Sequence, residues 1–500
     1  MKLSKTDFLV YRDCAHNAWL KIHKPEVYGE TPPSVFDQSI METGNEVDKL
    51  ARDLFPGGEL VARGDAGNTA QLVAEHSPIL YQPVFETDRY MTACDILVWN
   101  AAANVYDLYE VKSSTSGDNK KAKEELYTYD LAFQAEVLRE NRVPLGQVFL
   151  MRLDGEYVRG DKLDVQSLFS RDDFSERVGR SRESVAEEMA KAYEVLQSER
   201  ELPPPCSCLL KGRSAHCTTF AQTNPHVAEY SVHDITHIGM SQRKLGELID
   251  HGILAIEDVP DDFEGSDAQT NQVRAAKTKH AMIDTAAIEN FLSGVQYPIA
   301  FLDYETHPCA IPRFAGYRPY DHIPFQFSLD VIDGPDSEFV HHEFLFTQAG
   351  SPDAALLAAL KAAMPASGSV VTWNKTFEKG INDSLGKRNP GAREFLANVN
   401  ERVVDLMDVF STQAYVHPDF MGKTSIKNIQ PVLVPSLSYK HLAIQEGATA
   451  TVRWNEVVTG EVDATTAAQL RTELLRYCGR DTQVMVEIWR GLPRMISHAR

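Results

Sequence analysis

The feature that most constrains the fold is an apolar stretch, residues 299–305, that ends in the acidic pair Asp303 and Glu305. A short apolar run predicts a buried strand, and residues two apart in a strand point to the same face. The two carboxylates should therefore project together. Adjacent carboxylates repel each other unless a cation lies between them, and oxygen ligands suit Mg²⁺ or Mn²⁺. Taken alone, the pair also fits a strand that ends in a solvated acidic turn.

Two later segments carry residues of the same kind. Residues 369–373 predict a strand, and the helix that follows it carries Glu378. Residues 464–490 predict a long helix, in which Tyr477 and Asp481 are four apart and so lie on one face. This order of motifs resembles the DnaQ-like, RNase H-fold 3′–5′ exonucleases of the tyrosine-type DEDD class.

The resemblance implies a site for two divalent ions, which activate a water and stabilise the leaving oxygen. Its four metal carboxylates are matched by Asp303, Glu305, Glu378 and Asp481. Tyr477 matches the tyrosine that orients the attacking water, and Asp405, Ser425 and Lys427 match accessory positions. Glu378 stands where the class usually has an aspartate, and the longer side chain changes where a metal would be held.

The first half carries a second acidic pattern. Residues 90–99 and 105–114 predict a hairpin that places Asp95 near the second strand, where Glu110 and Lys112 share one face. Asp95 and Glu110 are suited to hold a divalent ion that lowers the pKa of a water. Lys112 is suited to orient the nucleophile or to offset charge on a scissile phosphate. A cross-strand salt bridge is the alternative interpretation.

Helices flank this hairpin. Residues 42–55 predict a helix that contains Glu46, and residues 124–138 predict another that contains Gln134. The whole order resembles the PD-(D/E)XK nuclease fold, closest to its RecB-like branch, over the first 220 residues or so. The motif positions of that branch are matched by Glu46, Asp95, Glu110, Lys112 and Gln134. The resemblance implies a second nuclease site, with Glu46 among its metal ligands; the alternative for Glu46 is a solvated residue.

The cysteines extend this resemblance. Cys14 stands alone near the start, and Cys206, Cys208 and Cys217 follow the nuclease motifs. This arrangement is similar to the iron–sulfur subgroup of these nucleases, although its C-x-C is tighter than the usual C-x-x-C. The similarity implies a 4Fe–4S cluster, with zinc as the alternative, that fastens the first helix to the end of the domain. The other thiols are predicted to be ordinary buried cysteines: Cys94, Cys309 and Cys478.

These motifs predict a multidomain α/β fold. We expect a PD-(D/E)XK restriction-endonuclease-like domain with its metal-cluster staple over residues 1–225 and an RNase H-like mixed-sheet exonuclease domain over residues 296–500. Residues 226–295 predict a helical connector that loosely resembles a helix–hairpin–helix module; a plain connector is the alternative. The combination resembles an uncharacterised bacterial family that carries a domain of unknown function.

Charge and hydropathy limit the compartment and the partners that we expect for this chain. The net charge of −21 argues against non-specific attraction of the whole surface to nucleic acid or anionic membrane. No apolar run approaches ~18 residues, and residues 1–7 lack the apolar core of a signal peptide. We therefore expect a cytoplasmic protein without a membrane partner. The expected function is metal-dependent hydrolysis of nucleic-acid ends, of DNA or alternatively RNA, with 3′–5′ trimming in the second half. The alternative is a nucleic-acid-binding or scaffold protein in which one or both sites are degenerate.

Overall fold

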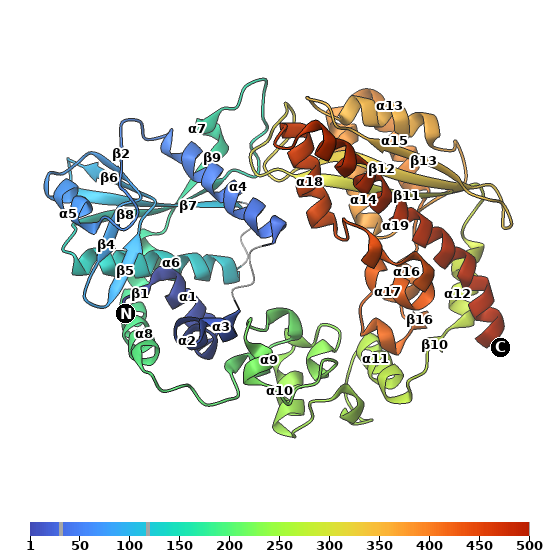
Figure 1. Cartoon of the computed structure of the whole chain (residues 1–500), viewed down its shortest axis with the longest axis horizontal. Helices are drawn as coiled ribbons and strands as arrows, with labels where there is room; N and C mark the ends of the chain where they lie inside the picture. Colours follow the sequence, from blue (N-terminus) through green and yellow to red (C-terminus); the bar gives the residue numbers. More distant parts are fainter. Residues whose placement is uncertain (30–33, 117–120, 500) are drawn as a thin grey trace. The chain divides into compact units, whose positions relative to one another are not determined.

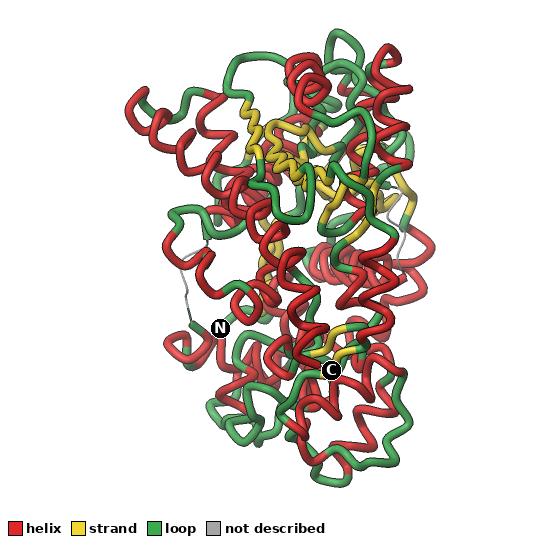
Figure 2. The backbone as a smooth tube through the Cα atoms, turned by 90° about the vertical axis from the view of Figure 1, so that its right-hand side faces the viewer, coloured by secondary structure: helices red, strands yellow, loops and turns green. Residues whose placement is uncertain are grey.

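The computed structural model describes residues 1–29, 34–116 and 121–499, and it shows a multidomain α/β protein with two large mixed sheets. The chain divides into two compact units. Unit 1 comprises Met1–His226 and Ala310–Asp321, and unit 2 comprises Val227–Cys309 and His322–Arg500. In each unit helices flank the strands (Figures 1 and 2). Of residues 226–295, expected to be a helical connector, His226 falls in unit 1 and the others cluster with unit 2.

Unit 1 is built around a six-stranded sheet. Across it the strands are β2 (Glu59–Leu60), β3 (Ile79–Tyr81), β6 (Ile96–Asn100), β7 (Val105–Thr115), β8 (Leu145–Leu153) and β9 (Phe169–Asp173). β7 is antiparallel to β6 and parallel to β8. The parallel pair is joined through helix α6 (Lys121–Glu140), since parallel strands need a crossover connection. The helix is buried along most of its length and packs against α8 (Ser175–Gln197).

The predicted strand over residues 90–99 is interrupted. Its first part, β5 (Tyr90–Ala93), lies in a small sheet between β1 (Leu3–Ser4) and β4 (Val84–Glu86), whereas β6 belongs to the large sheet. Asp95 lies in the gap between the two parts, where its carbonyl accepts a hydrogen bond from the backbone N–H of Gln82 at 2.9 Å. The break places the Asp95 side chain at the end of β6, beside β7.

The N-terminus of unit 1 forms two short helices. α1 (Lys5–Asp13) begins after Ser4, whose hydroxyl caps the helix by accepting a hydrogen bond from the Asp7 N–H, and α2 (Ala15–His23) follows directly. Phe8 of α1 lies against Phe133 of α6, with ring centroids 5.2 Å apart. This contact holds α1 on the helix that faces the sheet. Cys14 lies at the junction of the two helices.

Unit 2 contains a five-stranded sheet. Across it the strands are β13 (Val340–Leu345), β12 (His322–Ile332), β11 (Ile299–Pro308), β14 (Ser369–Thr372) and β15 (Val403–Asp405). The central strand β11 is antiparallel to β12 and parallel to β14, which is parallel to β15. The predicted apolar strand is therefore the middle of this sheet.

The two faces of β11 differ because side chains alternate along a strand. Ala300, Leu302 and Tyr304 belong to an apolar core with helices α13 (Asp353–Ala363), α14 (Lys375–Arg388) and α15 (Arg393–Glu401). Asp303 lies on the opposite face, beside the long helix α19 (Ala464–Ala499). Hydrogen bonds fix this helix on the sheet, among them one between the hydroxyls of Ser328 and Thr482 at 2.7 Å.

Helices α12 (Thr285–Ser293), α17 (Ile426–Leu433) and α18 (Gly447–Thr459) pack against α19. Helices α10 (Gln242–Asp250) and α11 (Asp267–Thr278) form a separate apolar cluster. Strand β10 (Met282–Ile283) pairs with β16 (Tyr415–Val416), which ties the segment before β11 to the rest of the unit. Among the helices in the described part of the chain, none combines the length and the apolar character needed to cross a membrane.

Candidate functional sites

Unit 2 brings the four predicted carboxylates close enough to interact electrostatically. β11 supplies Asp303 and Glu305, the first turn of α14 supplies Glu378, and α19 supplies Asp481. Glu305 is 8% exposed, Glu378 2% and Asp481 7%. The ligand atoms of Asp303 and Glu305 lie within 4.8 Å of each other and of a thiol, that of Cys478. The structure thus brings residues from three separate elements to one place.

The negative charge of this group is only partly balanced, since Lys427 lowers the pKa values of Asp303, Glu305 and Asp481 without reversing their rise. Burial raises the pKa of Asp303 well above its usual range, and the neighbouring Asp481 raises it further. Burial, followed by the charge of Asp303, raises the pKa of Glu378 to about 9. Burial likewise raises the pKa of Asp481 to about 6. In the described residues, Glu378 Oε2 has no hydrogen-bond partner. Buried carboxylates that repel one another in this way are stabilised in their ionised form by a bound cation.

Two tyrosines border the acidic group. The Tyr477 hydroxyl accepts a hydrogen bond from Lys427 Nζ at 2.9 Å, and Lys427 also donates to the carbonyl of Gln445 at 2.7 Å. The Tyr439 hydroxyl donates to the carboxylate of Asp481. Sequence reasoning singled out Tyr477 and Lys427 but missed Tyr439. No periodic pattern marks that tyrosine, because it lies in a short turn of 3₁₀ helix over Tyr439–His441.

The other accessory residues shape the elements that carry the acids. Asp405 accepts hydrogen bonds from the backbone N–H groups of Asn374 and Lys375, at 3.0 and 2.8 Å, and so fixes the start of α14. Asn374 adopts a left-handed conformation with φ of 88°, which asparagine tolerates better than most residues. Ser425 precedes α17, the helix that carries Lys427. Asp405 therefore positions Glu378 through the backbone.

Unit 1 gathers its predicted residues into a hydrogen-bonded network. Lys112 Nζ donates to Glu110 Oε1 at 2.6 Å and to Asp130 Oδ2 at 2.7 Å. Gln134 Nε2 donates to Glu110 Oε2 at 2.7 Å and to Asp130 Oδ1 at 2.9 Å. From α1, Lys5 Nζ lies 2.8 Å from Glu110 Oε1 and 3.1 Å from Asp130 Oδ1. Two buried carboxylates thus face two ammonium groups and one amide.

Two members of this network were missed by sequence reasoning. Asp130 had a signal, because it lies four residues before Gln134 on α6 and hence on the same helix face. Lys5 had none, because its contact with Glu110 joins residues 105 positions apart. Burial is the largest single influence and acts to raise the pKa of Glu110, but the two ammonium groups together outweigh it and hold that pKa below its usual range.

Asp95 lies at the edge of the network. Its carboxylate accepts from the Val111 N–H at 2.8 Å and from Gln82 Nε2 at 3.2 Å, and burial followed by the charge of Glu110 raises its pKa to about 7. The structure leaves Glu46 exposed on α4 (Val35–Arg52). Asp48, two residues further on, instead accepts from the same Gln82 amide at 3.4 Å. The residue of α4 that contacts the Gln82 amide beside Asp95 is therefore Asp48, and not the predicted Glu46.

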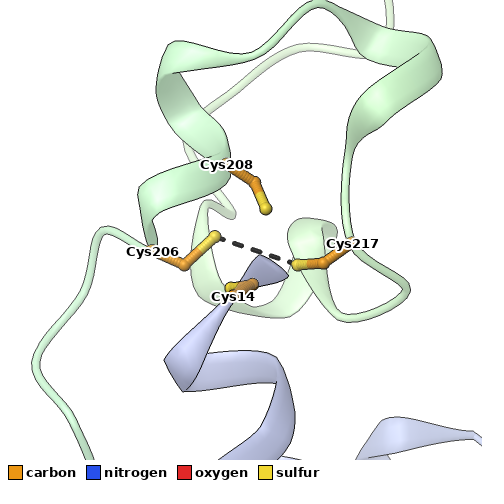
Figure 3. A group of neighbouring side chains, drawn as sticks. All are labelled: Cys14, Cys206, Cys208 and Cys217. Carbon is orange, nitrogen blue, oxygen red and sulfur yellow. Dashed lines mark hydrogen bonds between the residues drawn. The ribbon is translucent and has the colours of Figure 1, made fainter. Parts of the chain in front are cut away.

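The four predicted cysteines come together in unit 1. Cys14 projects from the junction of α1 and α2, while Cys206, Cys208 and Cys217 come from the segment after α8, and all four thiols point toward a common centre (Figure 3). Their sulfurs lie within 4.8 Å of one another, and those of Cys206 and Cys217 are 4.0 Å apart. This group is close enough to bind a metal. A tetrahedral zinc ion with Zn–S bonds of about 2.3 Å separates its sulfur ligands by about 3.8 Å.

Polar groups surround the thiols. The Asn17 N–H donates to Cys14 Sγ at 3.5 Å, and Asn224 Nδ2 donates to Cys206 Sγ at 3.4 Å. Asn17 Oδ1 in turn accepts from the Thr219 hydroxyl at 2.9 Å, which joins α2 to the segment that follows Cys217. Donors of this kind stabilise negative charge on metal-bound sulfur. The group therefore has the second layer of contacts that a metal centre requires.

Comparisons with known proteins give one match. A family described as "Domain of unknown function (DUF2779)" matches residues 300–425. The match covers about a quarter of the chain and includes Asp303, Glu305 and Glu378 but ends before Tyr477 and Asp481. No protein with a curated description matches the chain.

Proposed function

We propose that this protein is a metal-dependent nuclease that hydrolyses phosphodiester bonds at nucleic-acid ends. The observation that carries the proposal is the group of four carboxylates in unit 2, half-buried Asp303 and buried Glu305, Glu378 and Asp481, with raised carboxyl pKa values and a tyrosine beside them. Such a group is costly in the absence of a cation and well suited to bind one.

The architecture of unit 2 supports the RNase H-like, DnaQ-like assignment. The first two acids lie on the central strand β11, the third begins a helix after the parallel strand β14, and the fourth lies on the last helix. Tyr477 and Asp481 share one face of α19, as the spacing of the tyrosine-type DEDD class requires. The mixed sheet of unit 1, with α6 between the parallel strands β7 and β8, supports the PD-(D/E)XK assignment in the same way.

In unit 2 the four carboxylates would hold divalent cations, Mg²⁺ or Mn²⁺, which supply charge stabilisation at the scissile phosphate and a more acidic water. Lys427 fixes the Tyr477 hydroxyl by donating to it, so the phenol proton is directed away from the lysine and is free to orient the attacking water. Tyr439 holds the Asp481 carboxylate in one rotamer by donating to it. These contacts hold the Tyr477 hydroxyl and the Asp481 carboxylate in place beside the proposed cations.

Unit 1 supports two functions. In the nuclease interpretation Asp95 and Glu110 would hold a cation, and Lys112 would face the scissile phosphate. A second candidate, in which unit 1 binds nucleic acid without cutting it, is favoured by one observation: Glu110 and Asp130 are already paired with the ammonium groups of Lys5 and Lys112. Endonucleolytic products that persist unchanged in Glu110→Ala would support binding alone.

The thiol group of unit 1 is proposed to hold a metal centre that fastens α1 to the end of the unit. The order of the cysteines favours a 4Fe–4S cluster, and the sulfur separations below 4.8 Å favour a single zinc ion, because the ligands of a cubane each bind a different iron and lie further apart. Visible absorption and metal analysis of anaerobically purified protein distinguish the two. Iron with visible absorption indicates the cluster, and colourless protein with one zinc indicates the ion.

The nuclease proposal is tested with Mn²⁺ and 5′-labelled single-stranded DNA and RNA. We expect the wild type to give a ladder of progressively shorter labelled products, and Asp481→Ala to lose it by at least about 100-fold. Glu473→Gln is the matched control, since it alters another acid on α19, one that accepts from Gln469. A ladder that persists in Asp481→Ala would move the activity to unit 1, where Lys112→Ala is the next variant. No cleavage of either nucleic acid would contradict the proposal and favour a binding protein.

A further inference from the structure

The acidic group of unit 2 contains a thiol that the proposed reaction does not use. Cys478 follows Tyr477 on α19 and is fully buried. Its Sγ lies 3.5 Å from Asp303 Oδ2, and the ligand atoms of Cys478, Asp303 and Glu305 all lie within 4.8 Å of one another. The thiol is therefore in position to bind the same cation as these two carboxylates.

A weak S–H···O hydrogen bond to Asp303 is the simplest role for this thiol. Two observations point beyond it. The sulfur lies close to both carboxylates, so it completes a set of three donor atoms from two elements that surround one position. In addition, Glu378 is 2% exposed, its Oε2 lacks a hydrogen-bond partner among the described residues, and its charge interacts with that of Asp303. A buried, unpartnered oxygen beside such a set indicates a ligand.

We propose that Cys478 is a direct ligand of the cation held by Asp303 and Glu305, and that this site selects a thiophilic divalent cation, of which Zn²⁺ is the type, over Mg²⁺. The inference rests on the proposed function, in which these two carboxylates bind a divalent cation. Carboxylates alone suit Mg²⁺ and Mn²⁺, whereas a sulfur ligand shifts the preference toward softer ions. Coordination replaces the S–H proton, which leaves to solvent, and forms one sulfur–metal bond without any change of oxidation state.

The test measures cation binding in the full-length protein, with its four-thiol centre already loaded. Cd²⁺ is the probe, because its bonds to thiolates absorb in the ultraviolet, and Zn²⁺ and Mg²⁺ are added as competitors. The variants are Cys478→Ser and Cys478→Ala, and Cys309→Ser is the control, since Cys309 lies outside the group of three ligands. Subtracting the spectrum of Cys478→Ser from that of the wild type cancels the absorption of any Cd²⁺ that exchanges into the four-thiol centre. Unchanged circular dichroism shows that each variant folds.

We expect wild type and Cys309→Ser to bind one Cd²⁺ with a thiolate band that Zn²⁺ suppresses and Mg²⁺ does not. Both Cys478 variants should lose this band, and their affinity for Zn²⁺ should fall by about 10- to 100-fold while that for Mg²⁺ stays within about twofold. An unchanged band and affinity in Cys478→Ser would overturn the inference.

Binding of Mn²⁺ separates this inference from the proposed function. If Asp303→Asn lowers the affinity for Mn²⁺ but Cys478→Ser leaves Cd²⁺ and Zn²⁺ binding unchanged, the thiol is not a ligand and the nuclease proposal stands. If wild type and Asp303→Asn bind Mn²⁺ equally, the carboxylates hold no cation, and both proposals are contradicted.

Discussion

Each unit of this protein contains a group of buried carboxylates, but the two groups differ in how their negative charge is balanced. In unit 1 the buried carboxylates of Glu110 and Asp130 are neutralised by the chain itself, through two lysines. In unit 2 Lys427 donates to a tyrosine hydroxyl, and although its charge acts on the acids, the carboxyl pKa values of Asp303 and Glu305 stay raised. A cluster of buried acids therefore indicates a cation site most strongly where the charges of the protein leave its carboxyl pKa values raised.

The largest expected effect is on the free energy of unfolding, and it has opposite signs for the two units. In chelator at pH 8, Glu110→Gln should lower the free energy of unfolding by about 2–4 kcal/mol, because an amide N–H₂ would face ammonium and amide donors. Glu305→Gln should raise it by about 1 kcal/mol, because it removes one of several repelling charges. Denaturant unfolding measures both. Destabilisation of similar size in both variants would break the comparison.

A cation should stabilise unit 2 by an amount that depends on pH. In the metal-free protein the pKa of Glu378 is about 9 and that of Asp481 about 6, both above the values in an unfolded chain. The folded state therefore holds more protons, and its stability falls as pH rises from about 4 toward 9. Mn²⁺ at 100 times its Kd should add about 2.7 kcal/mol.

Thermal unfolding between pH 5 and 9 checks this expectation. Mn²⁺ should flatten the decline in stability, and Glu378→Gln should reduce the slope that the metal-free protein shows between pH 7 and 9. The interval above pH 7 is chosen because Asp95 of unit 1, whose pKa is about 7, contributes below it. Equal slopes in Glu378→Gln and wild type would show that Glu378 is ionised without a metal.

Removal of one lysine should make unit 1 resemble unit 2. Lys5→Met leaves Glu110 and Asp130 with one ammonium group between them and should cost about 1–3 kcal/mol of stability. The same variant should gain stability on addition of Mn²⁺ beyond that of wild type, since a carboxylate is freed. Lys5→Arg keeps the charge and serves as the matched control. If Mn²⁺ stabilises Lys5→Met and wild type equally, neutralisation by Lys5 is not what distinguishes the units.

The smallest expected effect concerns Asp330, an acid of unit 2 that is paired with a histidine. His341 Nδ1 lies 2.6 Å from Asp330 Oδ1, and this hydrogen bond raises the pKa of His341. Its contribution is fully present below pH of about 6.5 and is lost as pH rises through the raised value. Because the imidazole is partly exposed, His341→Gln should cost only about 0.5–1 kcal/mol at pH 5.5 and less at pH 9. A cost that is the same at both pH values would contradict this assignment.

Several elements could be predicted from the sequence because their signals are local. The strand with Asp303 and Glu305 and the helix with Tyr477 and Asp481 each follow from spacing within one element. The grouping of Cys14 with the three later cysteines was also predicted, here from a resemblance in motif order, and the structure places the four thiols close enough to bind a metal.

The interruption between β5 and β6 could not be predicted. Residues 90–99 carry a continuous strand pattern, but the two halves pair in different sheets, and it is this pairing that leaves Asp95 at the strand end. Glu46 and Asp48 are two residues apart on one helix, and the sequence does not show which of them faces the Gln82 amide. Packing against β7 decides that orientation.

The sequence by itself determined which chemical groups share an element face, since strand and helix periods are set by local backbone geometry. Only the tertiary structure decided which distant side chains reach those groups. Lys5 meets Glu110 across 105 positions, while Cys478 meets Asp303 across 175. Contacts over such separations depend on how strands pair and helices pack, and charge balance depends on those contacts. For that reason two similar acidic patterns became one self-neutralised network and one group suited to a metal ion.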